Sequence, residues 1–210
     1  MSLFSIPLSR HPRGLFVLLA VEVPDLFGRF GIMALLALYM TSTLHYTDHQ
    51  AFMTYSTFLM LSFITPLGGG YLVERQMSYP WAIVLGSLIM CIGNLCMMVT
   101  GLPMLYLGLS LVVIGIGLFS PSLAAMISDL YQADEQLRDS GFVMYYIVKN
   151  IGALLGPICC GIAGAVWGYQ YAFALCAVAI LLGGVIFLSY YHRQMGSVGE
   201  KSSRQSGHPL

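Results

Sequence analysis

Six long apolar segments separated by short polar turns constrain this chain more than any other feature. The segments cover residues 14–40, 50–73, 80–100, 103–128, 138–166 and 169–191. A helix that crosses a membrane needs about 20 predominantly apolar residues, and each segment reaches that length. The sequence therefore predicts an all-α membrane protein with one six-helix transmembrane domain over residues 14–193, between a cytoplasmic N-terminus (1–13) and a disordered cytoplasmic tail (194–210).

The composition excludes several other classes of protein. Hydrophobic residues make up 58% of the chain and charged residues 9%, whereas soluble domains contain about 45 to 50% apolar and about 25% charged residues. Nine Lys and Arg balance nine Asp and Glu, so no basic surface for nucleic acid is expected. The lipid bilayer is the predicted environment.

Enzyme and metal chemistry find little support in the sequence. All five histidines fall in turns or near the ends, at His11, His45, His49, His192 and His208. The chain therefore offers no intramembrane Ser-His pair, and it has no G-x-S-x-G motif. The five cysteines lie in apolar segments without the spacing of a zinc site, and we expect them to be packing residues. We predict no enzyme activity, no metal and no cofactor.

Basic residues predict the orientation in the membrane. Seven of them fall on one side of the predicted helices, at Arg10, Arg13, Arg75, Arg138, Arg193, Lys201 and Arg204. The turns on the other side, 41–49, 101–102 and 167–168, contain no Lys or Arg. Because short cytoplasmic loops retain Lys and Arg, we expect both termini in the cytoplasm of a multi-pass protein of the plasma (inner) membrane.

Four charged residues lie inside the apolar segments. Glu22, Asp25 and Arg29 fall in the first segment and Lys149 in the fifth. An ionised side chain near the bilayer centre costs about 2.5 to 3.5 kcal/mol on insertion scales, so it marks a functional site by default. Spacings of three and four residues place the first three side chains on one helical stripe, where Asp25 can pair with Arg29.

These four charges predict a proton-coupling site with an ion pair. Two acids beside one base leave one carboxylate in need of a second cation or a proton, and Lys149 can supply the cation. We hypothesise that protonation of Glu22 or Asp25 releases Lys149 to hold a substrate carboxylate. The alternatives are a structural salt bridge in the first segment and a Lys149 side chain that reaches out to water.

Two prolines predict breaks in helices. Pro24 lies among the charges of the first segment, and Pro121 lies in the fourth segment within GLFSPSL. A proline inside a helix removes one backbone hydrogen bond and kinks the helix. Broken helices at corresponding positions of two three-helix halves are typical of transporters built from inverted repeats.

Two stretches resemble signature motifs of a known transporter family. EVPDLFGRFG, followed by ALLALYM, is similar to the helix-one motif E-x-x-E-R-F-x-Y-Y-G, with Glu22 matching and Asp25 as a shortened acid. RDSGFVMYYIVKNIGAL resembles the family's second signature except at Lys149, where a small or aliphatic residue is expected. The family is the proton-coupled oligopeptide transporters of the major facilitator superfamily.

Two further stretches carry the same resemblance. GGYLVER is similar to the superfamily loop G-x-L-x-D-R, which implies a conformational role for Gly70, Glu74 and Arg75. GIGLFSPSL resembles the segment G-x-G-L-F-K-x-N of helix four, with Ser120 in the place of the lysine. Together the four stretches resemble the N-terminal six-helix half of the family, which implies a major-facilitator-like half-bundle with a 3+3 inverted repeat.

The resemblance implies symport of di- and tripeptides with protons. Asn150 matches the family's helix-five asparagine, so Tyr146 and Asn150 are expected to contact a peptide, together with Ser120; polar packing within the bundle is the alternative for the first two. Leu26 replaces the family's motif arginine, while Arg29 and Lys149 supply cations at other positions. We expect the coupling site to be relocated accordingly.

The family has twelve or more helices, and its substrate lies between two six-helix halves. The resemblance therefore leaves three readings of this chain open: a homodimer, a half that pairs with a separate C-terminal chain, or a remnant without transport activity. A non-transporting membrane fragment or interaction subunit, and a facilitator for another small solute, remain the alternatives to peptide symport.

Overall fold

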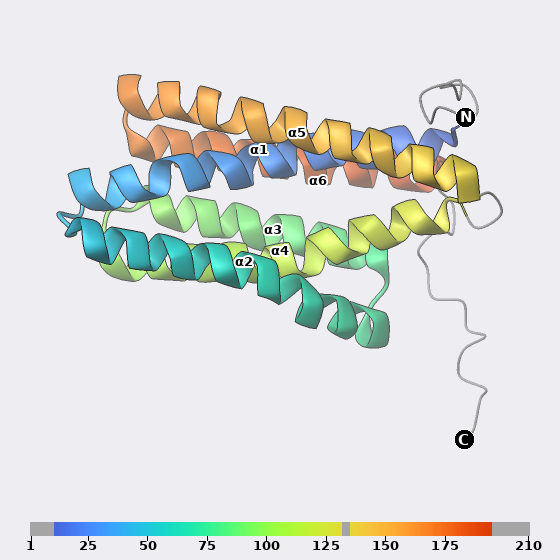
Figure 1. The fold of residues 1–210 in the computed structure, drawn as a ribbon, viewed down its shortest axis with the longest axis horizontal. Coiled ribbons are helices and arrows are strands. Elements are labelled where there is room, and N and C mark those ends of the chain that lie inside the picture. Colours follow the sequence, from blue (N-terminus) through green and yellow to red (C-terminus); the bar gives the residue numbers. More distant parts are fainter. Residues whose placement is uncertain (1–10, 132–134, 195–210) are drawn as a thin grey trace.

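A computed structural model describes residues 11–131 and 135–194, and it consists of six helices (Figure 1). Their bounds are α1 (Arg13–Ser42), α2 (Asp48–Gln76), α3 (Tyr79–Met98), α4 (Leu102–Asp129), α5 (Glu135–Val166) and α6 (Tyr169–Gln194). The predicted all-α fold class and the number of helices are confirmed. The predictions for residues 1–10 and for the tail after Gln194 lie outside the described residues.

Helix ends differ from the predicted spans where local signals prolong a helix. A capping box, in which Thr47 and Gln50 exchange side-chain and backbone hydrogen bonds, begins α2. The same helix continues to Gln76, so Glu74 and Arg75 lie in its last turn and not in the predicted loop. That loop prediction was wrong because the polar residues after the apolar run remain helical until the chain becomes extended at Met77.

The helices pack in a pattern that repeats after three helices. α1 packs mainly against α5 and α6, α4 packs mainly against α2 and α3, and α3 packs against α6. The repeat exchanges α1 with α4, α2 with α5 and α3 with α6. This exchange converts the α1–α5 contact into α4–α2 and the α1–α6 contact into α4–α3, and it leaves the α3–α6 contact unchanged. The helix contacts therefore have the symmetry of a 3+3 repeat, as the fold prediction requires.

Paired glycines bring α3 and α4 into close contact. A Cβ atom on Gly93 would lie 2.7 Å from the carbonyl oxygen of Gly108, and one on Gly108 would lie 2.6 Å from the carbonyl oxygen of Gly93. Gly86 and Gly115 form the same reciprocal pair one heptad away. Because no larger side chain fits there, these glycines set the distance between the two backbones.

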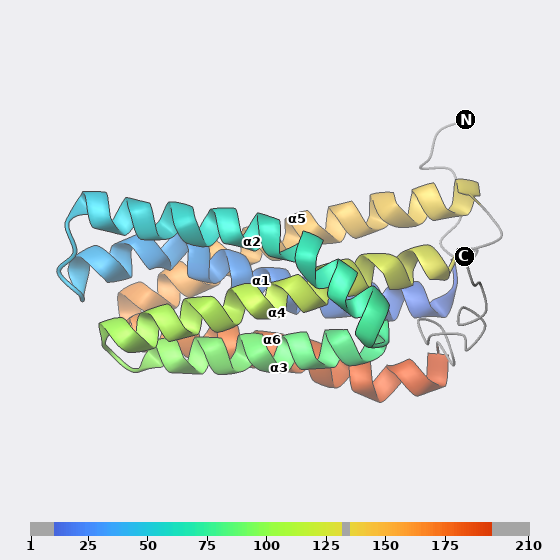
Figure 2. The same ribbon diagram turned by 90° about the horizontal axis from the view of Figure 1, so that it is seen from below.

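Four helices contain an internal proline. The predicted Pro24 and Pro121 lie inside α1 and α4, and the sequence analysis did not single out Pro66 in α2 or Pro157 in α5. These helices are the two exchanged pairs of the repeat, α1 with α4 and α2 with α5. Figure 2 shows α2 turning away from its initial direction in its second half.

Five helices of the described chain, α2 to α6, are long and apolar enough to cross a membrane. α1 has 30 residues but carries Arg13, Glu22, Asp25 and Arg29. The helix that falls short on composition is thus the one that contains most of the intramembrane charges. The five spans give the described chain the architecture of a multi-pass membrane protein.

Candidate functional site

Three charged side chains of α1 are buried inside the bundle. Glu22 is 1% exposed, Asp25 is 2% exposed and Arg29 is 12% exposed. They lie on one helical stripe, as the sequence predicted, since their spacings are three and four residues. Such groups remain ionised in an apolar environment only when other charges compensate them.

The compensating charges come from α1 and α5. Arg29 Nη2 forms a close ion pair with Asp25 Oδ2 and lies 4.0 Å from Glu22 Oε1. Lys149 Nζ of α5 also lies 4.0 Å from Glu22 Oε1. We call these four residues the charge cluster; it contains two carboxylates and two cations, so it is neutral when all four groups are ionised.

The side chain of Lys149 connects the charge cluster with the surface of the bundle. It is 40% exposed, whereas its partner Glu22 is almost completely buried. Its ammonium group also lies 5.0 Å from the centroid of the Tyr145 ring, within reach of a cation–π interaction. Tyr145 lies one turn before Lys149 in the sequence, and this helical spacing is the signal that could have placed its ring beside the ammonium.

Ser120 joins α4 to the charge cluster. Arg29 Nη1 donates a hydrogen bond of 3.0 Å to the hydroxyl oxygen of Ser120. The sequence analysis placed this serine in the substrate site. In the described structure its hydroxyl accepts from Arg29, so this hydrogen bond links α1 with α4.

Glu22 is the least satisfied member of the charge cluster. Both of its carboxylate oxygens are buried, the Tyr145 side chain lies beside them, and no cation forms with them a close pair like the one that joins Asp25 to Arg29. Its compensation consists of two cations at 4.0 Å, one of them half-exposed. A buried carboxylate without a close cation can exchange its ion pair for a proton, because a bound proton removes the cost of burying the negative charge.

Tyr146 and Asn150 lie together on an exposed face of α5. Tyr146 is 68% exposed, and the amide nitrogen of Asn150 donates a hydrogen bond of 2.8 Å to the carbonyl oxygen of Tyr146. Lys149 lies between them in sequence, one turn after Tyr146. A solute on this face would therefore meet an aromatic ring, an amide and a cation, which suits the predicted peptide contact.

The three residues of the predicted conformational motif lie at the far end of α2. A Cβ atom on Gly70 would lie 3.3 Å from Cβ of Pro121 in α4, so this glycine packs beside the proline of the other helix. Glu74 and Arg75 are exposed, and the guanidinium carbon of Arg75 lies 4.6 Å from the centroid of the Tyr71 ring. Gly70 thus belongs to the α2–α4 contact, while Glu74 and Arg75 face outward.

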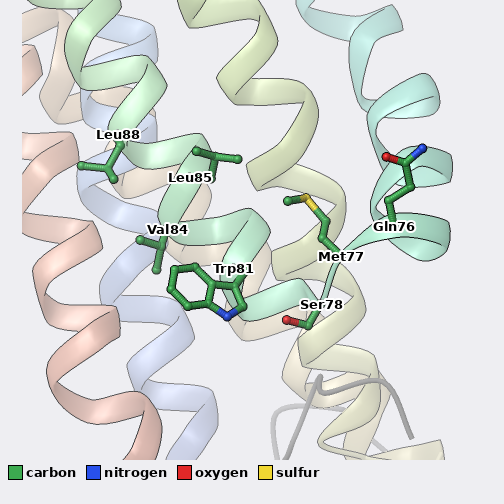
Figure 3. Close-up of a pocket in the computed structure, with 7 residues that line it drawn as sticks. All are labelled: Gln76, Met77, Ser78, Trp81, Val84, Leu85 and Leu88. Atoms are coloured by element: carbon green, nitrogen blue, oxygen red, sulfur yellow. The ribbon is translucent and has the colours of Figure 1, made fainter. Parts of the chain in front are cut away.

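Two hollows in the described surface lie apart from the charge cluster. One has a volume of about 430 Å³ at the α2–α3 turn, and Figure 3 shows Trp81 and Leu85 of α3 beside Met77 of the turn. The other, of about 480 Å³, lies between α2 and α4 and is lined by residues such as Thr57, Tyr106 and Ser110. Neither contains a member of the charge cluster. Among the described residues, no group of three or more His, Cys, Asp or Glu could hold a metal.

Two hydrogen bonds fasten the turns at opposite ends of the bundle. His11 Nδ1 lies 2.8 Å from the hydroxyl of Tyr131, and burial lowers the pKa of His11 and raises that of Tyr131 to about 12. The hydroxyls of Tyr46 and Tyr106 lie 2.8 Å apart, and this bond raises the pKa of Tyr46 to about 12. His11 was predicted only as a terminal residue, and no sequence signal indicated its burial.

Comparison with known proteins agrees with the observed architecture. A family profile described as Major Facilitator Superfamily matches residues 18–209. The chain is 29% identical over 195 residues to the transporter YclF of Bacillus subtilis (strain 168), and 24% identical over 208 residues to dipeptide and tripeptide permease B of Xenorhabdus bovienii (strain SS-2004). These alignments cover 90% and 98% of this chain but only 40% and 42% of the relatives.

Solved structures show the same relation. A crystal structure of the peptide transporter POT in complex with sulfate matches with a TM-score of 0.88 and 29% identity, over 93% of this chain and 41% of that one. A POT family transporter in complex with 5-aminolevulinic acid matches with a TM-score of 0.88 and 30% identity, over 96% of this chain and 43% of that one. The chain thus spans less than half the length of the transporters that it resembles.

Proposed function

The chain belongs to the Major Facilitator Superfamily, and from this membership we propose that it takes part in the symport of di- and tripeptides with protons. The similar permeases are named for dipeptides and tripeptides, and family and structural neighbours are transporters, not enzymes. One observation carries the proposal: Glu22 is 1% exposed, and its ion-pair partner Lys149, a half-exposed cation of another helix, lies 4.0 Å away.

The proposed coupling follows from the charges of the cluster. With all four groups ionised, Lys149 is neutralised by Glu22. When Glu22 takes up a proton, the cluster gains one positive charge, and the Lys149 ammonium becomes available to a substrate carboxylate. Proton and substrate then bind cooperatively. The proton on Glu22 removes the negative charge that would repel the substrate carboxylate, and the substrate carboxylate neutralises the Lys149 ammonium that protonation leaves unpaired.

The exposed face of α5 would receive the rest of the peptide. Tyr146 and Asn150 lie within one turn of Lys149, so their ring and amide can contact a peptide whose carboxylate pairs with the ammonium. A peptide also carries an ammonium group, for which this face offers no acidic residue. We propose that a second six-helix half, either another copy of this chain or a separate chain, supplies the remaining contacts.

A related solute with a carboxylate and an amine is the second candidate substrate. One similar POT family transporter was solved in complex with 5-aminolevulinic acid. The same cation and amide on α5 suit the carboxylate of such a compound as well as that of a peptide. Labelled 5-aminolevulinic acid therefore belongs in the same uptake assay.

The proposed location is the plasma (inner) membrane, with the start of α1 and the end of α6 on the cytoplasmic side. α1 begins and α6 ends at the same end of the bundle (Figure 1). Arg75, Arg138 and Arg193 lie in helix ends on this side, and the turns at the other end carry no Lys or Arg. This distribution favours a cytoplasmic position for the basic end.

Uptake in cells that lack their own peptide carriers tests the proposal. We expect cells expressing the chain to accumulate a labelled dipeptide and to lose this uptake with a protonophore. Glu22→Gln and Lys149→Met should each lower uptake at least tenfold, because each removes one partner of the proton-sensitive pair. Arg138→Gln is the matched control, since it removes an exposed cation of the same helix outside the charge cluster, and it should retain uptake.

The contrary result is equally clear. If the chain is inserted in the membrane but uptake equals that of empty cells, with and without a co-expressed second half, the chain is a non-transporting membrane component. Uptake that persists in Lys149→Met and still responds to the protonophore would refute coupling through the charge cluster.

A further inference from the structure

Two thiols meet where α5 packs against α6. Cys160 of α5 and Cys176 of α6 are completely buried, and their sulfur atoms lie 3.4 Å apart. In this arrangement one thiol donates a hydrogen bond to the other, and both remain free thiols. Cysteines that only fill apolar space have no need to place their sulfur atoms in contact across two helices.

The backbone of α1 closes the third side of this thiol pair. A Cβ atom on Gly31 would lie 2.6 Å from Sγ of Cys160 and 3.0 Å from Sγ of Cys176. Both sulfur atoms therefore rest on the surface of a glycine, with no side chain between them. Three helices hold the two sulfurs in place, so the pair is a fixed feature of the packed bundle.

We propose that Cys160 and Cys176 form an oxidisable dithiol site whose disulfide links α5 to α6. A disulfide bond has an S–S length of about 2.04 Å, so the sulfurs must approach by about 1.4 Å from their separation of 3.4 Å. The inference is independent of the proposed transport function.

The oxidant belongs to the class of lipid-soluble two-electron acceptors, such as quinones or azodicarboxamides. Two S–H bonds break and one S–S bond forms, while the acceptor takes up the two electrons and the two protons. With an azodicarboxamide, the N=N bond becomes a hydrazine. A thiol in an apolar interior ionises poorly and reacts slowly, so the reaction requires an acceptor that enters the bilayer.

Counting free thiols tests the site on the full chain in membranes. The protein is reduced, treated with diamide, an azodicarboxamide, then denatured in excess N-ethylmaleimide and weighed as an intact monomer. All five cysteines should react before oxidation. After oxidation we expect two fewer adducts, and digestion should yield one linked peptide pair containing Cys160 and Cys176.

Variants separate this pair from the other thiols. Cys160→Ser and Cys176→Ser should each abolish the intramolecular loss of adducts. Cys159→Ser is the matched control, because this neighbouring thiol is exposed whereas Cys160 is buried, and the variant should still lose two adducts. The peptide pair from the unmodified chain provides the same evidence if a serine variant does not fold.

Two results would overturn the inference. One is retention of every adduct at a diamide concentration that oxidises a model dithiol in the same membranes. The other is an equal loss of adducts in Cys160→Ser, which would assign the disulfide to different cysteines. Neither result bears on peptide uptake, so this inference and the proposed function fail separately.

Discussion

Removal of the Arg29 side chain should destabilise the bundle more than removal of any surface charge. Arg29 is the cation shared by both buried carboxylates, with Asp25 in close contact and Glu22 Oε1 at 4.0 Å. At an effective dielectric constant of about 20, two charges separated by 4.0 Å interact with about 4 kcal/mol. Arg29→Met leaves two buried acids that repel each other, with the half-exposed Lys149 as their nearest remaining cation.

We expect Arg29→Met to lower the free energy of unfolding by about 3 to 5 kcal/mol, the usual cost of removing one partner of a buried ion pair. At about 2 to 4 °C per kcal/mol for a chain of this size, the thermal midpoint in mild detergent should fall by about 6 to 20 °C. The double variant Arg29→Met with Asp25→Asn should recover most of this loss, because it removes the uncompensated charge together with the cation.

The control is Arg75→Met, which removes an exposed guanidinium that lies over the Tyr71 ring. Its expected cost is less than about 1 kcal/mol. A midpoint for Arg29→Met equal to that of the unmodified chain would refute the argument that buried charge dominates this site. A double variant no more stable than the single one would assign the loss to side-chain packing.

Two further predictions concern packing and pH. Gly108→Ala should lower the free energy of unfolding by about 1 to 3 kcal/mol, because its methyl group meets the Gly93 carbonyl. Gly161→Ala, with no neighbour within 4 Å, should leave the free energy of unfolding unchanged or raise it by up to about 1 kcal/mol. Equal shifts of the thermal midpoint in the two variants would contradict the glycine contact. Because burial lowers the pKa of His11 below 6.5, the unfolded chain binds a proton first on acidification, so stability should decrease as the pH falls through 6.5. Thermal midpoints measured between pH 8 and pH 5 should decrease less for His11→Gln, which keeps a polar partner for Tyr131, than for the unmodified chain. Identical pH profiles of the two proteins would refute the lowered pKa of His11.

The charge cluster differs from the pattern that the sequence resembles in a way that the structure explains physically. Ser120 stands where the family's helix-four lysine is expected, and Arg29 donates a hydrogen bond to it. Lys149 approaches Glu22 from α5. The protein thus places two cations 4.0 Å from one oxygen of the buried glutamate, although neither cation occupies the position expected from the family.

The sequence by itself determined the class of fold and the residues that carry charge into the membrane. Long apolar segments can satisfy their backbone hydrogen bonds in lipid only as helices, so their existence followed from composition and length. The i,i+4 pairing of Asp25 with Arg29 also followed from local spacing, since a helix fixes the relation between residues four apart. Pro24 and Pro121 were also visible, because a proline within an apolar segment marks a break in the helix from the sequence alone.

Only the tertiary structure decided which groups from different helices meet. No local pattern specifies that Lys149 approaches Glu22, that Ser120 accepts from Arg29, or that two thiols sixteen residues apart lie in contact. These contacts depend on how far each helix is rotated and how closely it packs, which the glycines set through backbone contacts on other helices. The burial of His11 is likewise a consequence of the turn that carries Tyr131.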